Sequence, residues 1–152
     1  MKNLFHFSIF LLLVFGFLAC DKCEIPETTQ SGNIIHNVVV RENSTALTNF
    51  DTVLVNDDAT NIVYDSIDVS FDGGLNFVPV DFSSYSLMAM KTRTNCSATF
   101  DRTVVIDDDN QTANYSIRIN ECPTCVNTIV TDNWVLVEKI PDTYTVTFDI
   151  LP

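Results

Sequence analysis

Apolar and polar side chains alternate at every second position through much of the last third of this chain. Phe100, Val104 and Ile106 lead into an acidic turn at 107–110, and the same spacing resumes over 115–119. Successive side chains of a β-strand point to opposite faces, so this spacing collects the apolar side chains on one face of each segment. The pattern predicts two antiparallel strands joined in a hairpin, each with one buried face.

The middle of the chain shows the same texture around a pair of glycines. Gly73-Gly74 lies between two alternating segments, which is typical of a β-hairpin. Pro79 restricts the second of these strands to a sheet edge or a strand end, because proline has no N–H to donate to a neighbouring strand. The segment 86–91, in which residues 87–90 are all apolar, is predicted as a strand, although its composition also suits a helical turn.

These patterns together predict an all-β fold, since no stretch beyond residue 20 sustains a helical period. We expect a single antiparallel β-sandwich or barrel-like domain over residues 34–152. Trp134, Val146 and Phe148 are expected in its core. Its further strands are expected at 34–41, 52–55, 67–71, 75–80, 134–140 and 144–150, and the last two are expected to pair around Pro141.

The N-terminus carries an apolar run that ends in a cysteine. Lys2 precedes the run 4–20, and polar residues follow it at once, which is the order of an export signal. The run is shorter than the ~20 apolar residues that span a membrane. Ala19 directly before Cys20 resembles the lipobox of bacterial lipoproteins, and this resemblance implies a signal peptide at 1–19 and a lipid on Cys20. The alternative is a cleaved secretory peptide that leaves Cys20 as a disulfide partner.

Residues 20–33 contain Pro26, Gly32 and a polar run, with Ile25 as the only aliphatic residue. This composition predicts a flexible tether between the lipid and the domain. The membrane is therefore the first expected partner, through the lipid on Cys20. The expected location is the cell envelope, at the outer membrane or the cell surface, and the sequence does not specify the leaflet.

The mature chain is strongly acidic. The full chain has 8 basic and 20 acidic residues, and removal of the signal peptide takes Lys2 away, so the mature net charge is 7 minus 20, or −13. Such a surface repels phosphate backbones, and the chain has no basic stripe. We therefore exclude nucleic acid as a partner.

From residue 80 onward the chain is similar to a known family of lipoproteins. The segment 81–87, a strand near 115–117 and the segment 134–141 resemble, in spacing and in aromatic and apolar positions, the C-terminal domain of the PrcB family. Members of this family are lipoprotein subunits associated with a surface protease complex. The resemblance implies a non-catalytic accessory module with an exported protein, such as a protease, as its partner. Residues 94–97 read Thr-Asn-Cys-Ser where the family often has Thr-Gly-Gly-Tyr.

The cysteines are expected to form structural disulfides. Cys122 and Cys125 have the CxxC spacing of redox and zinc sites. A redox motif opens a helix, however, and a zinc site needs further ligands at paired spacing. With Cys20 lipidated and the compartment oxidising, disulfides among the other four are the stronger interpretation.

The pairing of these cysteines is predicted from the register of the expected hairpin. If Ile106 faces Tyr115, the ladder sets Cys96 opposite Cys125, and Cys23 is left to pair with Cys122. A slip of two residues makes the pair Cys96–Cys122 equally reachable.

The remaining candidates carry weak signals. His36 is the only histidine of the mature chain and has no nucleophile motif to serve, so no catalytic residue is predicted. The acidic turn at 107–109 could attract calcium but lacks the spacing of a calcium loop, so no metal or cofactor is predicted. Thr52 and Ser66 resemble the short O-glycosylation signal of exported Bacteroidota proteins.

We therefore carry three hypotheses of function. The leading one is a membrane-anchored lipoprotein of the cell envelope whose non-catalytic β-domain binds or assists another exported protein, such as a protease. The alternative is a glycan-binding or adhesive β-module. The third, and least favoured, is an envelope hydrolase, because nothing in the sequence singles out a catalytic pair.

Overall fold

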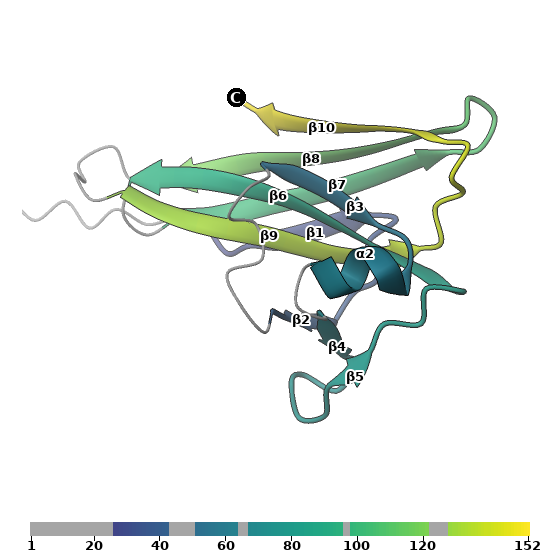
Figure 1. Ribbon diagram of the computed structural model, residues 1–152. Coiled ribbons are helices and arrows are strands. Elements are labelled where there is room, and N and C mark those ends of the chain that lie inside the picture. Colours follow the sequence, from purple (N-terminus) through teal and green to yellow (C-terminus); the bar gives the residue numbers. More distant parts are fainter. Residues whose placement is uncertain (1–25, 43–50, 64–66, 96–97, 122–127) are drawn as a thin grey trace, which may run out of the picture.

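The computed structural model describes residues 26–42, 51–63, 67–95, 98–121 and 128–152. Within these ranges most residues lie in strands, and the single helix is α2 (Asp58–Val63). The described strands form three sheets, and none of these sheets closes on itself (Figure 1). The mostly β fold is confirmed, whereas the barrel alternative is not borne out.

We call the sheets the four-stranded sheet, the middle sheet and the small sheet. The four-stranded sheet has the order β1 (Thr29–Gly32), β7 (Ala98–Asp107), β8 (Thr112–Glu121) and β10 (Thr145–Leu151). The middle sheet has the order β3 (Thr52–Val55), β6 (Tyr85–Asn95) and β9 (Thr128–Glu138). The small sheet has the order β2 (Val39–Arg41), β4 (Asp68–Ser70) and β5 (Val78–Pro79).

The middle sheet is buried on both of its faces. Met88 of β6 packs in a core shared with the four-stranded sheet, which contributes Tyr115. Leu87, its neighbour in sequence, packs in a second core shared with the small sheet, which contributes Val69. A strand covered on both faces needs apolar side chains at successive positions, and this explains why the run 86–91 does not alternate. Its prediction as a strand is confirmed.

Several other local predictions hold. β3 spans the predicted range 52–55, and Pro79 lies in the outermost strand of the small sheet, where its missing N–H costs no ladder hydrogen bond. The helix α2 was not predicted, because a single short turn shows no sustained period. Asp57 caps it by accepting the N–H of Thr60 at 2.6 Å, and this hydrogen bond lowers the pKa of the Asp57 carboxyl.

The expected tether is wrong at its C-terminal end. Residues 29–32 form β1, which pairs with β7 in parallel over Asp101 to Val104. Gly32 has a φ of 72°, and a Cβ at this position would collide with the carbonyl oxygen of Val104. A polar, flexible composition therefore concealed an edge strand whose approach to β7 depends on a glycine.

The last strand pairs with a different neighbour from the one expected. The segments 134–140 and 144–150 were predicted to pair with each other, whereas β10 lies parallel to β8 in the four-stranded sheet. Tyr144 donates its N–H to the carbonyl of Pro141 at 3.0 Å, and this turn carries the chain from one sheet to the other. With β1 also parallel to its neighbour, the sheets are not purely antiparallel.

The core prediction for these strands holds in part. Trp134 is buried, with 7% of its surface exposed. Val146 and Phe148 are only half-buried, because β10 is an edge strand and has no neighbour on its outer side among the described residues.

The β7–β8 hairpin forms as predicted, but its register differs by two residues. Ile106 pairs with Ala113, and Tyr115 pairs with Val104. The turn is shorter than expected because Asp107 already pairs with Thr112. The pairing of Cys96 with Cys125 was argued from the longer turn and loses that support, whereas the alternative Cys96–Cys122 was argued from the register now observed.

The N-terminal predictions and the cysteines lie outside the described residues. These are the signal peptide at 1–19, the lipid site Cys20, and Cys23, Cys96, Cys122 and Cys125. They stay predictions. In the described part of the chain, no helix has the length and apolar character needed to cross a membrane.

Candidate functional site

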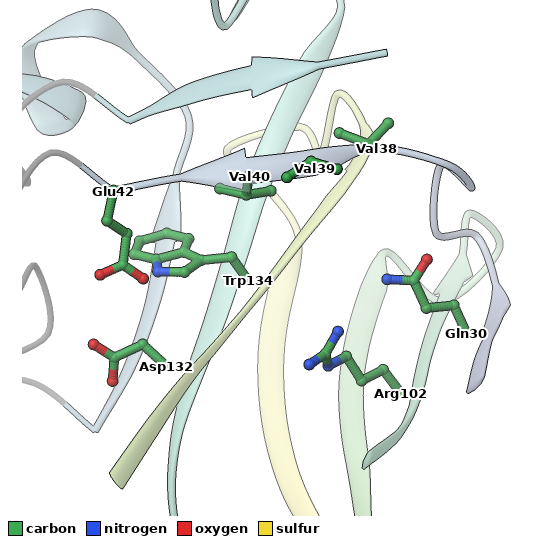
Figure 2. A pocket seen from close by; sticks show the side chains of 8 residues that line it. All are labelled: Gln30, Val38, Val39, Val40, Glu42, Arg102, Asp132 and Trp134. Carbon is green, nitrogen blue, oxygen red and sulfur yellow. The ribbon is translucent and has the colours of Figure 1, made fainter. Parts of the chain in front are cut away.

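A pocket of about 350 Å³ lies where edge strands of the three sheets meet. β1 is an edge strand of the four-stranded sheet, β2 of the small sheet and β9 of the middle sheet. The pocket is lined by Gln30, Val38, Val39, Val40, Glu42, Arg102, Asp132 and Trp134 (Figure 2). Its walls therefore come from segments that are distant in sequence.

The chain between β1 and β2 builds this corner. Asn33 donates its N–H to the carbonyl of Val104 at 2.8 Å, and Ile35 donates its N–H to the carbonyl of Leu136 at 2.8 Å. Ile34 between them is buried, with 3% exposure. The chain thus leaves the four-stranded sheet, crosses the edge of β9 and enters the small sheet, which brings all three layers to one place.

The strand predicted over 34–41 is interrupted where this crossing ends. Asn37 has a φ of 61°, in the left-handed region that asparagine tolerates better than most residues. The turn at His36-Asn37 redirects the chain, and only Val39 to Arg41 continue as β2. His36 is exposed and does not line the pocket.

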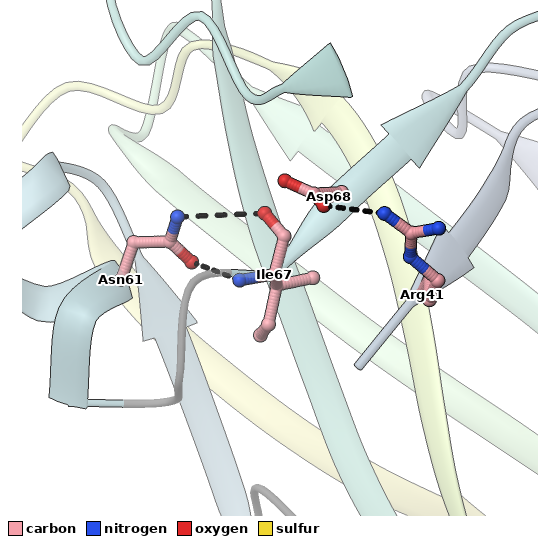
Figure 3. Close-up of polar contacts among 4 residues, drawn as sticks. All are labelled: Arg41, Asn61, Ile67 and Asp68. Atoms are coloured by element: carbon pink, nitrogen blue, oxygen red, sulfur yellow. Dashed lines mark hydrogen bonds and ion pairs between the residues drawn. The ribbon is translucent and has the colours of Figure 1, made fainter. Parts of the chain in front are cut away.

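Polar contacts of Arg41 and Asn61 hold the small sheet in position (Figure 3). Arg41 of β2 forms an ion pair with Asp68 of β4 at 2.8 Å. The buried Asn61 side chain accepts the N–H of Ile67 at 3.0 Å and donates to its carbonyl at 3.4 Å, which ties α2 to the start of β4. The guanidinium of Arg41 also lies 4.1 Å from the ring centre of Phe77. β2 is therefore anchored to β4 and to the loop before β5.

Arg102 is the cation of the pocket. Its side chain occupies an inward position of β7, between Phe100 and Val104, and is half-buried between the four-stranded sheet and the middle sheet. Its Nε and Nη2 atoms donate to the same oxygen, Oδ1 of Asn133, at 3.2 and 2.9 Å. Burial lowers the pKa of the Arg102 guanidinium, which nevertheless stays charged, as arginine does in proteins.

Asn133 is fully buried and fixes the position of this guanidinium. Its Nδ2 atom donates to the carbonyls of Met90 and Thr131, at 3.3 and 3.2 Å, and to the hydroxyl of Thr92 at 2.9 Å. Carbonyl oxygens only accept hydrogen bonds, so the amide nitrogen must face them and Oδ1 must face Arg102. The arginine head group is thus held by an acceptor with a single allowed orientation.

Tyr115 completes this polar group from the four-stranded sheet. Its hydroxyl donates to the backbone carbonyl of Asn133 at 3.1 Å. Burial raises the pKa of the Tyr115 hydroxyl, although the nearby Arg102 opposes the shift. The tyrosine stays neutral, so it offsets none of the charge on Arg102.

The opposite side of the pocket is acidic. Figure 2 shows the carboxylates of Glu42 and Asp132 together on one side, and Arg102 and Gln30 on the other. One carboxylate oxygen of Asp132, Oδ1, is buried and has no hydrogen-bond partner in the described part of the structure. Trp134 and the valines lie between the two sides. The pocket thus offers donors at one side, acceptors at the other and an apolar wall between them.

Thr52, the predicted glycosylation residue that the structure describes, does not line this pocket. Thr52 begins β3 and is exposed, on the edge of the middle sheet away from β9. Ser66 lies outside the described residues. Both assignments stay predictions.

The acidic turn of the β7–β8 hairpin has local partners. Asp107 accepts the backbone and side-chain N–H groups of Asn110, at 3.0 and 2.7 Å, and these bonds lower the pKa of its carboxyl. Asp108 accepts the hydroxyl of Tyr144 at 2.7 Å. Among the described residues, no group of three histidines, cysteines or carboxylates is arranged to hold a metal ion.

A second candidate surface is the outer edge of β10. Thr145 donates its N–H to the carbonyl of Gln111, beside β8, at 2.9 Å. Alternate residues of a strand turn their N–H and C=O groups to opposite sides, so those of Val146, Phe148 and Ile150 point away from β8. In the described part of the structure no strand lies on that side. The edge is open for pairing.

Comparison of this chain with family models, with curated proteins and with solved structures finds no significant match. The function must therefore be argued from the pocket and the open edge. Neither Arg102 nor Asn133 was predicted from the sequence as a site residue. A signal for the first was present, because Arg102 interrupts the alternation between Phe100 and Val104 at a position that should be apolar.

Proposed function

We propose that the chain is a membrane-anchored lipoprotein of the cell envelope whose non-catalytic, sandwich-like β-domain binds another exported protein. The observation that carries the proposal is the open edge of β10. An extended segment of a partner adds there as a further strand, with its backbone hydrogen-bonded to the free groups of the edge. The resemblance of residues 81–141 to the PrcB family suggests an exported protease as the first partner to test.

The edge of β10 lacks the features that usually block such pairing. Residues 145–151 contain no proline and no lysine. The one charged side chain, Asp149, accepts the amide of Asn114 at 2.6 Å and so lies over the sheet. Ile150 and Leu151 are 57% and 38% exposed, which gives a partner strand apolar surface to cover. Given a net charge of −12 for the full chain, a partner segment with basic residues is favoured.

The anchor part of the proposal depends on Cys20. Each buried CH₂ of an acyl chain contributes about 0.8 kcal/mol, so several chains hold a protein firmly on a bilayer. Cys20→Ala should yield an unprocessed precursor or a soluble product, measured by membrane fractionation with a carbonate wash. A variant that is still processed after Ala19 and stays membrane-bound as before would remove the lipid anchor from the proposal.

The partner is tested by site-specific cross-linking in the native host. A photo-reactive amino acid is placed at position 150 of β10 in one variant and at position 62 of α2 in a matched control. Ile62 is also an exposed isoleucine, at 68%, but lies on a helix with no free strand edge. We expect an adduct with a defined exported protein at position 150 only, identified by mass spectrometry.

The binding mode has its own variant. Ile150→Lys places a charge on the edge and should reduce the adduct formed from a probe at position 148, whereas Ile62→Lys should not. Equal adducts at positions 150 and 62, or no adduct at either, would contradict the proposed surface. An adduct with an exported protein that is not a protease would support the binding module and reject the protease as its partner.

A further inference from the structure

Arg102 occupies a place in the core where a charge is costly. Its inward-facing neighbours on β7, Phe100 and Val104, are both buried in the core between the four-stranded sheet and the middle sheet. A partly buried cation lowers stability unless hydrogen bonds and an opposite charge compensate for its lost hydration.

The protein compensates only part of this cost. Asn133 supplies one neutral oxygen, which accepts both hydrogen bonds recorded for Arg102. The Phe100 ring adds a long-range contact, with 5.7 Å between the guanidinium carbon and the ring centre. No carboxylate among the described residues forms an ion pair with Arg102. In a chain that carries 20 acidic residues, this arginine is left without a negative partner in that part of the structure.

The remaining donors of Arg102 face the pocket. A guanidinium has N–H groups on both of its terminal nitrogens, and the hydrogen bonds to Asn133 use Nε and Nη2 only. Gln30 of β1 is the register partner of Arg102 and lines the same side. Its side-chain amide adds a donor there (Figure 2). Two neighbouring donor groups, one of them charged, suit a planar anion such as a carboxylate.

The other side of the pocket calls for donors on the ligand. Asp132 lines this side of the pocket. Its Oδ1 atom is buried and has no hydrogen-bond partner among the described residues, so a ligand meets the other carboxylate oxygen, Oδ2. Glu42 lies on the same side. These carboxylates repel a doubly charged anion more strongly than a singly charged one, which disfavours phosphate and sulfate.

We propose that the pocket binds a small carboxylate that also carries hydrogen-bond donors. The carboxylate lies on Arg102 and Gln30, and the donors face Asp132, across the apolar wall of Val40 and Trp134. The volume of about 350 Å³ is at the low end for ligand pockets and fits one small molecule. This inference is independent of the partner bound at β10.

The donors have two chemical sources. In a sugar acid they are hydroxyl groups, and in an amino acid they are an ammonium group. Asp132 accepts from both, and its negative charge strengthens both kinds of hydrogen bond, but the ammonium gains more because it is itself charged. The two sources therefore differ in how they respond when Asp132 is neutralised.

The test uses the full chain purified in detergent and four probes. These are galacturonate and leucine, and their counterparts without a carboxylate, galactose and leucinamide. Trp134 is the only tryptophan of the chain and lines the pocket, so its fluorescence reports binding there. We expect at least one carboxylate to bind, and its counterpart to bind about tenfold more weakly or worse. Equal binding of a carboxylate and its counterpart, or no binding of either carboxylate up to about 10 mM, would overturn the proposal.

Arg102→Gln removes the charge while keeping a donor that can reach Asn133. This variant should weaken the binding of the carboxylate ligand about tenfold or more. Arg93→Gln is the matched control, because Arg93 is exposed on β6 and the variant loses the same charge elsewhere. Unchanged binding by a folded Arg102→Gln variant, or equal losses in both variants, would overturn the assignment. If Arg102→Gln does not fold, the comparison of the four probes on the wild-type chain still decides.

The Asp132→Asn variant distinguishes an ammonium donor from hydroxyl donors by its effect on the affinity of each carboxylate. This variant should weaken the binding of leucine about tenfold if an ammonium faces Asp132, and should weaken the binding of galacturonate by less than that if hydroxyls do. A carboxylate whose affinity rises in Asp132→Asn has no donor on that residue, and this result would refute the proposed orientation.

Discussion

Asn133→Ala tests whether a single buried amide holds Arg102 in the core. Asn133 is fully buried and accepts two hydrogen bonds from the Arg102 guanidinium. The alanine variant leaves that cation between the sheets with no acceptor in its place. Its effect should therefore exceed that of removing an ordinary buried asparagine.

The expected loss can be summed from the contacts. A hydrogen bond to a charged group contributes about 1.5–3 kcal/mol to the free energy of unfolding. Removing the buried side-chain atoms adds about 1 kcal/mol for lost packing. Loss of the hydrogen bond to Thr92 adds little, because the Thr92 hydroxyl still donates to the carbonyl of Thr131 at 3.4 Å. We expect a total loss of roughly 2.5–4 kcal/mol, a large part of the stability of a small domain.

Urea unfolding followed by circular dichroism measures this loss. Asn61→Ala is the matched control, since Asn61 is also buried but bonds only the neutral backbone of Ile67. It should lose about 1–2 kcal/mol. Arg102→Met combined with Asn133→Ala completes a double-mutant cycle, and the coupling should be about 1.5–3 kcal/mol. Additivity within about 0.5 kcal/mol, or equal losses for the two asparagines, would refute the reasoning.

Three further changes test other parts of the fold. Gly32→Ala should detach β1, because the new Cβ collides with the carbonyl oxygen of Val104, and hydrogen exchange should then speed up at the amides that β1 protects. Phe148→Ala should cost about 2 kcal/mol in urea unfolding, below the ~3–5 of a fully buried phenylalanine, because β10 is an edge strand. The hydroxyl of Ser70 is the main cause that lowers the pKa of Asp72 from 3.8 to about 2. The ionised Asp72 carboxylate therefore stabilises the folded state above its ordinary pKa of 3.8, and this stabilisation is lost as the pH falls towards 2. The melting temperatures of Asp72→Asn and of the wild type should therefore converge over that pH range.

Much of the local secondary structure could be predicted from the sequence. Alternation located the β7–β8 hairpin, and the lack of an N–H placed Pro79 at an edge. Both signals depend on a residue and its near neighbours in sequence. β3 was found at its observed bounds for the same reason, since turn-forming residues flank a short apolar run.

The candidate site could not be predicted from such local signals. Arg102 lies on β7 and Asn133 on β9, and their contact exists only because two sheets pack face to face. Gln30 reaches the pocket through parallel pairing of a segment whose composition resembles a flexible tether. No local preference encodes a contact between such distant segments.

The sequence by itself determined that this chain forms strands, roughly where most of them lie, and which side chains share a face. These properties follow from backbone sterics and from the spacing of apolar residues. Only the tertiary structure decided that β10 pairs with β8 and that the run 86–91 is covered on both faces. The physical reason is that any strand edge can pair with any other, so the choice depends on which faces can be buried together. The pocket at Arg102 is a product of that choice.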